Sequence, residues 1–327
     1  LYLPKQGIRN IVVTTVNAKE NYVGLGLEES GLVQYQTIPD CGGDGGALNI
    51  LQAYIRRVAP ARRLVLSLPI ASGDTLICHN EFLPNRMAMK ALASRFPRIG
   101  KIYWIHMIAP RLFRGYLGEF TDAFHWPTAR LVRYRLEQWL YRRSIPDDGV
   151  ILANNPWYRE TLKKWFPENR MHILSHYGGV DVPQMDVDKK YDLVWCGRFH
   201  AQKGLPELVD IVEQIKVTKP DVTLALIGSG DRNIERKLDR RVAAKGLERN
   251  IIRFGYLDGM KKFRTLQQAR VFVMPSWFES FGQVNLEAMK CGLPVVAYDL
   301  PVYGVFEKGM IQVPIGDNEA MACEILR

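Results

Sequence analysis

The stretch that decides the fold is residues 275–294, which read PSWFESFGQVNLEAMKCGLP. An apolar strand is expected over 271–275, a helix over 282–291 and a second apolar strand over 294–299. This order of strand, short loop, helix and strand is typical of a parallel α/β sheet. Such sheets bind ligands outside the carboxyl ends of their strands, where the first N–H groups of the following helix lack intrahelical partners and favour anions.

Two carboxylates, Glu279 and Glu287, lie on either side of the Ser-Phe-Gly turn that opens this helix. A phosphate held at the start of the helix would leave one carboxylate in the loop and the other about two turns further on. Those positions suit hydrogen bonds to hydroxyl-rich groups on both sides of a diphosphate.

The stretch resembles the signature of the retaining GT-B glycosyltransferases, a large family that includes bacterial α-mannosyltransferases and lipopolysaccharide-core glucosyltransferases. Its mark is a Glu, seven residues and a second Glu, here Glu279-Ser-Phe-Gly followed by Glu287-Ala-Met and Gly-Leu-Pro-Val-Val-Ala. The resemblance implies that Glu287 binds the ribose hydroxyls of a nucleotide-diphosphate sugar and that Glu279 lies beside the hexose. It also implies that the backbone N–H groups of Ser280, Phe281 and Gly282 help to hold the diphosphate.

A second motif, residues 194–204, reads VWCGRFHAQKG and places Arg198 and Lys203 between an expected strand and helix. It resembles the family's Gly-Arg, four residues, Lys-Gly motif, which implies that both cations hold the diphosphate. A leaving nucleoside diphosphate gains negative charge, so fixed cations stabilise the transition state more than the ground state. Either cation alone would be read as an exposed loop residue.

The nucleotide base is expected at the end of a third strand. The resemblance places the backbone of Gly255, Tyr256 and Leu257 at its edge, which leaves UDP, GDP and ADP sugars open. The Gly-Ser-Gly of residues 228–230 allows either a tight turn or a close approach to phosphate. No glycine stands where the third glycine of the G-x-G-x-x-G motif would be needed, which argues against a dinucleotide-binding dehydrogenase.

The first half of the chain offers two further candidate sites. Gly45 and Gly46 end a glycine-rich loop before an expected helix, and the resemblance implies that this loop faces the donor phosphates and the acceptor. A simple turn is the alternative, because in the family the loop directly follows the first strand. His106 ends an expected strand and matches a family position beside the donor sugar, whereas His79 is its competitor. Both could also have a purely structural role.

The 327 residues suit two domains of ordinary size, residues 1–180 and 191–327, joined by a polar linker at 181–190. The resemblance implies GT-B architecture, with two Rossmann-like doubly wound domains facing each other across a cleft. The chain stops at Arg327 inside an expected helix, so little of the family's C-terminal crossing helices is expected. The expected strands of the first half are 11–17, 33–39, 63–69, 74–79, 101–107, 149–154 and 171–176, and those of the second are 191–197, 223–228, 251–257, 271–275 and 294–299. The expected helices are 46–57, 84–96, 127–143, 156–166, 203–217, 232–246, 260–269 and 282–291.

Charge and aromatic residues concentrate in residues 86–143, which hold 12 Lys/Arg against 3 Asp/Glu, net +9, and 11 of the 34 aromatic residues. This mixture suits an anionic membrane surface, and a solvated basic face is the alternative. No nucleic-acid recognition motif accompanies the charge. The five cysteines are odd in number and scattered, which indicates buried thiols in a reducing cytoplasm and neither a disulfide framework nor a zinc site. No apolar run is long enough to span a membrane.

The sequence therefore predicts a retaining, metal-independent glycosyltransferase that moves a hexose from a nucleotide-diphosphate sugar to a lipid-linked or glycan acceptor. Bacterial polysaccharide or lipopolysaccharide synthesis at the cytoplasmic face of the inner membrane fits this interpretation, with no bound cofactor and no nucleic-acid partner. One alternative is a noncatalytic module that binds nucleotide sugars or membranes. A less favoured alternative is a glycoside hydrolase that uses Glu279 and Glu287 as its acid/base pair, which would leave Arg198 and Lys203 unexplained.

Overall fold

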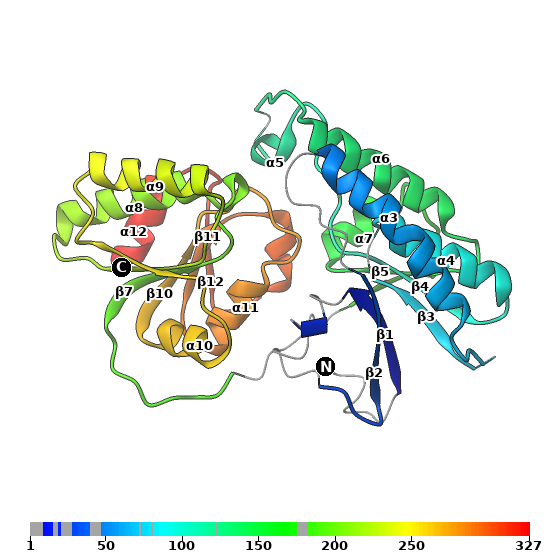
Figure 1. Ribbon diagram of the computed structural model, residues 1–327. Coiled ribbons are helices and arrows are strands. Elements are labelled where there is room, and N and C mark those ends of the chain that lie inside the picture. The colour runs from blue at the N-terminus through cyan, green and yellow to red at the C-terminus, as the bar shows by residue number, and fades with distance from the viewer. Residues whose placement is uncertain are drawn as a thin grey trace. The chain divides into compact units, whose positions relative to one another are not determined.

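The computed structural model describes residues 9–15, 19–20, 28–39, 47–71, 73–79, 81–121, 123–174 and 182–327 (Figure 1). Its contacts divide the chain into two compact units. Unit 1 comprises Leu1–Leu112 and Pro127–Gly178, and unit 2 comprises Phe113–Trp126 and Gly179–Arg327. The segment Phe113–Trp126 therefore belongs to unit 2, whereas the first domain predicted from the sequence was the continuous range 1–180.

Unit 1 is built on parallel strands that alternate with helices, as the sequence predicted. In its described part β1 pairs with β2, and a separate sheet has the order β3-β4-β5-β6. The strands are β1 (Asn10–Thr15), β2 (Val33–Ile38), β3 (Thr75–Cys78), β4 (Gly100–Ile105), β5 (Val150–Ala153) and β6 (Met171–Ile173). The helices are α3 (Ala47–Leu66), α4 (Leu83–Arg95), α6 (Ala129–Ser144), α7 (Pro156–Leu162) and the 3-10 turn η1 (Glu168–Arg170).

The strand expected over residues 63–69 is wrong, because α3 continues through this apolar run to Leu66. Ala61 and Val65 are one helical turn apart, and both are buried in a cluster with residues of β2 and α4. Burial of this helical face outweighs the backbone hydrogen bond that Pro60 removes inside the helix. A short apolar run fits a buried strand and a buried helical face equally well, so the sequence alone could not separate the two.

Unit 2 contains one parallel sheet of order β12-β11-β10-β7-β8-β9. The chain builds β7, β8 and β9 outward on one side and β10, β11 and β12 on the other, which is doubly wound topology. The strands are β7 (Tyr191–Cys196), β8 (Leu224–Ile227), β9 (Ile251–Gly255), β10 (Ala269–Met274), β11 (Val295–Tyr298) and β12 (Met310–Val313). The helices are α5 (Gly115–Gly118), η2 (Ala201–Lys203), α8 (Leu205–Thr218), α9 (Arg232–Ala244), α10 (Gly259–Gln267), α11 (Gln283–Lys290), η3 (Pro301–Val305) and α12 (Asn318–Leu326).

The core of unit 2 follows from its near-continuous apolar strands. Every residue of β8 and β11 is buried, as expected for parallel strands covered by helices on both faces. Each strand and helix predicted for this half is present, with ends that differ by a few residues. The sequence analysis named neither β12 nor the range of α12, which complete the sheet edge and its helical cover.

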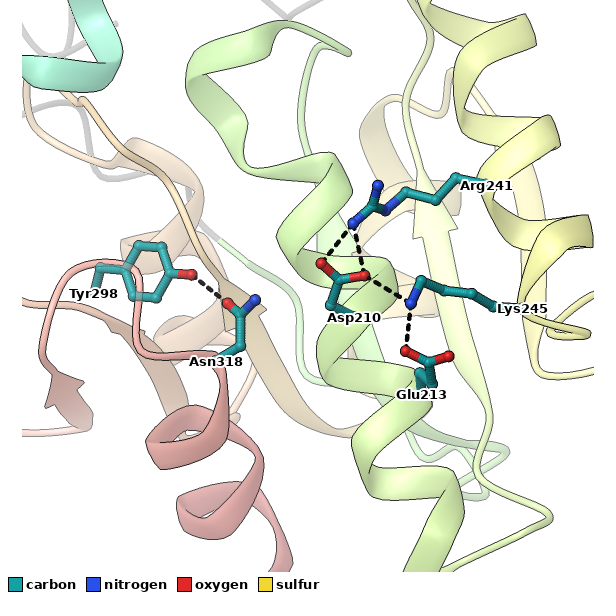
Figure 2. Close-up of polar contacts among 6 residues, drawn as sticks. All are labelled: Asp210, Glu213, Arg241, Lys245, Tyr298 and Asn318. Carbon is teal, nitrogen blue, oxygen red and sulfur yellow. Dashed lines mark hydrogen bonds and ion pairs between the residues drawn. The ribbon is translucent and has the colours of Figure 1, made fainter. Parts of the chain in front are cut away.

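Polar contacts connect the outer elements of unit 2 (Figure 2). Asp210 of α8 accepts hydrogen bonds of 2.8 and 2.6 Å from Arg241 of α9, and the ammonium of Lys245 lies 3.2 Å from the same carboxylate. Tyr298 of β11 lies 2.5 Å from the amide oxygen of Asn318 in α12. The first group of contacts links α8 with α9, and the second links β11 with α12, so these side chains have a structural role.

Candidate functional site

The topological switch point of unit 2 lies between β7 and β10. These two strands are neighbours at the centre of the sheet, yet the chain continues from β7 towards β8 and from β10 towards β11. Ligands of open α/β sheets bind in the crevice outside the carboxyl ends of such strands. The loops that leave these ends, residues 197–204 and 275–282, contain the predicted residues Arg198, Lys203 and Glu279 and the turn from Ser280 to Gly282.

The two loops are packed against each other. The Trp277 N–H donates a 2.8 Å hydrogen bond to the carbonyl of Gln202, whose side-chain amide donates to the carbonyl of Phe278 at 3.4 Å. Gly204 has a left-handed φ of +65°, and a Cβ at this position would lie 1.8 Å from the carbonyl oxygen of Pro275. Only glycine permits this approach. Lys203 of one loop and Glu279 of the other are thereby held in fixed proximity.

Lys203 and Glu279 form an ion pair across these loops. The Lys203 Nζ lies 2.6 Å from the Glu279 Oε1, and the two side chains are only 16% and 7% exposed. A buried charge needs a partner to offset its loss of hydration, and each residue provides one for the other. Both residues were predicted from the sequence, Lys203 as a ligand of the diphosphate and Glu279 as a residue beside the hexose. A phosphate bound to Lys203 would therefore compete with Glu279 for the same ammonium group.

Arg198 differs from Lys203 in being exposed on the loop that follows β7. Its guanidinium forms no ion pair with the residues that the structure describes. The next residue, Phe199, is 2% exposed and anchors the loop. Arg198 thus presents five N–H donors in a fork suited to phosphate oxygens, without a competing carboxylate.

Glu287 is also paired, with a cation that the sequence analysis missed. It lies on α11, is 6% exposed, and its Oε1 is 3.1 Å from the Nζ of Lys262 on α10. In the sequence Lys262 is one of two adjacent lysines in an unremarkable stretch, so no pattern distinguished it from surface charge. Each carboxylate of the motif therefore has its own lysine partner.

The thiol of Cys196 interacts electrostatically with several of these charged side chains. Cys196 is the last residue of β7 and is 7% exposed. Burial raises the pKa of its thiol to about 12, and the charges of Lys203, Lys262 and Glu287 act on the same group. A thiol with this pKa stays protonated at neutral pH, so Cys196 is a compact packing residue and not a nucleophile.

The start of α11 has the backbone geometry of a helix N-terminus without a side-chain cap. Gly282 occupies the cap position with a left-handed φ of +85°. A Cβ here would lie 2.8 Å from the ring of Tyr303, which explains the glycine. Ser280 is half-buried and Phe281 is buried against Phe306, with ring centroids 5.5 Å apart. The loop is thus held by its aromatic side chain, while α11 begins at the sheet edge where an anion would bind.

The glycines after β8 are explained by packing. A Cβ on Gly228 would lie 1.8 Å from the Gly197 carbonyl oxygen, and one on Gly230 would lie 2.6 Å from the Cβ of Phe199. The sequence left a tight turn and an approach to phosphate open, and close packing against the β7 loop is a third reason that accounts for both glycines. The Gly228 N–H also donates to the carbonyl of Gly255 at 2.7 Å, which places the end of β9 beside this turn. There Tyr256 is 73% exposed and Leu257 is half-buried.

Unit 1 brings both histidine candidates together. His79 follows β3, His106 follows β4, and their rings stack with centroids 5.7 Å apart. Trp104 lies against both rings, at 4.8 and 4.2 Å, and donates a 2.6 Å hydrogen bond from Nε1 to Asn154. Burial lowers the pKa of His106 to about 4 and also lowers that of His79. Both imidazoles are therefore neutral near pH 7, a state in which each can donate one hydrogen bond and accept another.

The structure offers little on the predicted glycine loop of unit 1 and on metal binding. Gly45 and Gly46 lie outside the described residues. In the described part of the chain no group of three or more His, Cys, Asp or Glu side chains is placed to hold a metal ion.

The packing of Phe113–Trp126 within unit 2 was not predicted from the sequence. Tyr116 and Phe120 contact the ring of Phe278 at centroid distances of 5.2 and 5.8 Å. Phe278 precedes Glu279, so this segment supports the candidate site.

Most of unit 2 is similar to a known protein family. Residues 190–327 match the family described as glycosyl transferases group 1. Phosphatidyl-myo-inositol mannosyltransferase of Mycobacterium leprae is 36% identical over 135 residues, 40% of this chain and 35% of that protein. D-inositol 3-phosphate glycosyltransferase of an Arthrobacter species is 32% identical over 167 residues, 46% of this chain and 40% of that protein. The matched part thus spans less than half the length of these relatives.

Solved structures establish the fold over most of the chain. Sucrose-phosphate synthase from Thermosynechococcus elongatus matches with a TM-score of 0.72 and 17% identity over 98% of this chain and 89% of that chain. HepE of Anabaena, solved with UDP and glucose, matches with a TM-score of 0.68 and 16% identity over 96% of this chain and 80% of that chain. The predicted fold class, α/β of GT-B type, is confirmed. The chain therefore has the GT-B fold, and its residues 190–327 match the glycosyl transferases group 1 family.

Proposed function

We propose that the protein is a retaining, metal-independent glycosyltransferase that transfers a hexose from a nucleotide-diphosphate sugar. The observation that carries this proposal is the arrangement at the switch point of unit 2. Arg198 and Lys203 leave the end of β7, Glu279 leaves the end of β10, and Glu287 lies on the helix that follows. A nucleotide sugar has a matching order of groups, with a diphosphate between two hydroxyl-rich rings.

Each residue has a role that follows from its charge and surroundings. Arg198 and Lys203 bind the diphosphate with the N–H groups of Ser280 to Gly282 and stabilise the charge that develops as it leaves. Glu287 accepts hydrogen bonds from the ribose hydroxyls, and Glu279 accepts them from the hexose. Gly255 to Leu257 border the base.

Unit 1 supplies the remaining proposed contacts. Neutral His106 can donate a hydrogen bond to the hexose without adding a positive charge. The role proposed for Gly45 and Gly46, binding the phosphates and the acceptor, rests on the sequence alone. His79 stacks beside His106, and burial lowers its pKa as well, so we assign it the supporting position. The glycoside hydrolase alternative gains no support, because each motif carboxylate is paired with its own lysine, whereas an acid/base pair for glycoside hydrolysis acts jointly on one sugar.

A donor panel tests the proposal directly. UDP, GDP and ADP, and then their sugar conjugates, are added to the purified protein, and thermal unfolding is recorded. A ligand that binds only the folded state raises stability by about 2.7 kcal/mol at a hundredfold excess over Kd, so the true nucleotide should raise Tm by several degrees. Nucleoside monophosphates with the same bases are the control, since they lack the second phosphate. A panel without any shift would contradict the proposal.

The acceptor is proposed to be lipid-linked or a glycan, in bacterial polysaccharide or lipopolysaccharide synthesis at the cytoplasmic membrane face. The name of the mannosyltransferase relative contains a phospholipid, which supports this choice. A second support is α6, where Val132, Leu136 and Trp139 recur at helical spacing and are 47%, 54% and 43% exposed. Arg130 and Arg143 are exposed on the same helix. An amphipathic surface of this kind suits an anionic membrane interface.

Not every arginine of α6 is available to lipid. Arg133 pairs with Glu137 at 2.6 Å, and Arg135 donates to the carbonyl of Pro110 at 2.8 Å. The proposed contact therefore depends on fewer cations than the sequence suggested and more on exposed apolar side chains. None of the described helices is long and apolar enough to cross a bilayer.

Vesicle flotation tests the membrane proposal. The protein should float with anionic vesicles at low salt, because each cation near such a surface contributes on the order of 1 kcal/mol. Binding should weaken towards 0.15 M salt, where the screening length is about 8 Å. Leu136→Gln with Trp139→Gln should remove the salt-resistant part, whereas Val217→Gln, at an 83% exposed apolar position of α8, should not. Indifference of the wild type to anionic vesicles at low salt would leave α6 as a solvated surface.

A further inference from the structure

Lys262 is the feature of the site that neither motif explains. It lies in the first turn of α10, a helix that contributes no residue to either sequence motif. Its Nζ is 3.1 Å from the Glu287 Oε1, and the two side chains are 18% and 9% exposed. Among the ion pairs of the described residues, this is the one that includes Glu287. Removing a carboxylate from water to this extent requires a compensating charge, and Lys262 supplies it.

The position of Lys262 places it within the candidate site. Its charge acts on the thiol of Cys196, the last residue of β7, together with the charges of Lys203 and Glu287. Its ammonium also lies 4.7 Å from the centre of the Phe263 ring, a buried residue of the same helix. The side chain is thus held between the helix surface and Glu287, and its direction is restricted. A flexible surface lysine would show neither contact.

We propose that Lys262 is a positioning residue that fixes the Glu287 carboxylate for the two vicinal hydroxyls of a ribose, which rests on the function proposed above. A carboxylate has about four lone-pair sites, and Lys262 occupies one of them on Oε1. The remaining sites can accept both hydroxyl protons while the ion pair stays intact. The site would then discriminate ribonucleotides from deoxyribonucleotides, with Lys262 as the residue that sets this preference.

The experiment measures ribose preference by calorimetry. The probes are the nucleoside diphosphate that gives the largest shift in the donor panel and its 2′-deoxy and 3′-deoxy analogues. A hydroxyl bonded to a charged acceptor should give wild type a ribose preference of roughly 10- to 100-fold. Lys262→Met should lower this preference about tenfold, because Glu287 loses its fixed orientation. Lys262→Arg should restore most of it, and Lys261→Met, the adjacent exposed lysine, should leave it unchanged.

A double variant keeps the test valid if Lys262→Met folds poorly. Lys262→Met combined with Glu287→Gln leaves no unpaired buried charge, and its ribose preference should equal that of Glu287→Gln alone. A wild-type ribose preference in folded Lys262→Met would overturn the inference. Equal weakening of the ribo- and deoxyribonucleotides would also overturn it, since that pattern indicates a contact with the diphosphate. Failure of the wild type to bind any nucleoside diphosphate would instead show that the proposed function is wrong, and the inference would fall with it.

Discussion

Replacing Arg198 by alanine is expected to lower turnover about 10²- to 10³-fold while leaving Tm almost unchanged. Loss of one fixed donor to a charge that develops in the transition state costs about 2.7–4 kcal/mol. Arg198 is exposed and forms no ion pair with the described residues, so its removal leaves no buried charge behind. Such surface substitutions change stability by about 0.5 kcal/mol or less. The rate is measured as release of nucleoside diphosphate from the sugar conjugate that stabilises the protein most.

Lys203→Ala should show the same loss of turnover together with a lower Tm. Its removal leaves Glu279, whose side chain is 7% exposed, without its partner. The pair of variants therefore separates catalysis from stability. Lys237→Ala, at an exposed cation of α9, is the control for a general loss of positive charge. Wild-type turnover in folded Arg198→Ala would remove this residue from the site.

The strands and helices of residues 191–299 could be predicted from the sequence because their patterns are local. Each buried parallel strand is a short apolar run, and the strand, loop and helix around Glu279 follow one another directly. Both motifs contain a glycine that the backbone requires, because Gly204 and Gly282 have left-handed φ values that favour this residue. The motifs could not show which neighbouring atoms make each glycine necessary, the Pro275 carbonyl for Gly204 and the Tyr303 ring for Gly282.

Contacts between residues that are far apart in the sequence could not be predicted from it. Lys203 and Glu279 are 76 residues apart, and their pairing depends on β7 and β10 being neighbours. Lys262 has no local signal because its importance comes only from the position of Glu287 on another helix. In the same way, the end of the helix at Leu66 depends on burial against β2 and α4. Tertiary packing decided all three, and local propensity is a weak guide in such cases.

The pairing of Lys203 with Glu279 changes what substitution of Glu279 should do. Glu279→Gln is expected to leave binding of the bare nucleoside diphosphate equal to wild type or up to about tenfold tighter, because Lys203 loses its competing carboxylate. The same variant should lower turnover of the sugar conjugate roughly 10- to 100-fold, since a hydrogen bond to a charged acceptor contributes about 1.5–3 kcal/mol. Binding and turnover would then move in opposite directions.

Glu287→Gln is the matched control, because it makes the same chemical change at the other carboxylate of the motif. It should weaken the bare nucleoside diphosphate by about 1.5–3 kcal/mol, since its proposed partner is the ribose that every donor carries. Calorimetry with the nucleoside diphosphate and with its sugar conjugate separates the two roles. If both variants weaken both ligands equally, the carboxylates do not divide ribose and hexose between them, and the ion pair of Glu279 with Lys203 serves only to hold the two loops together.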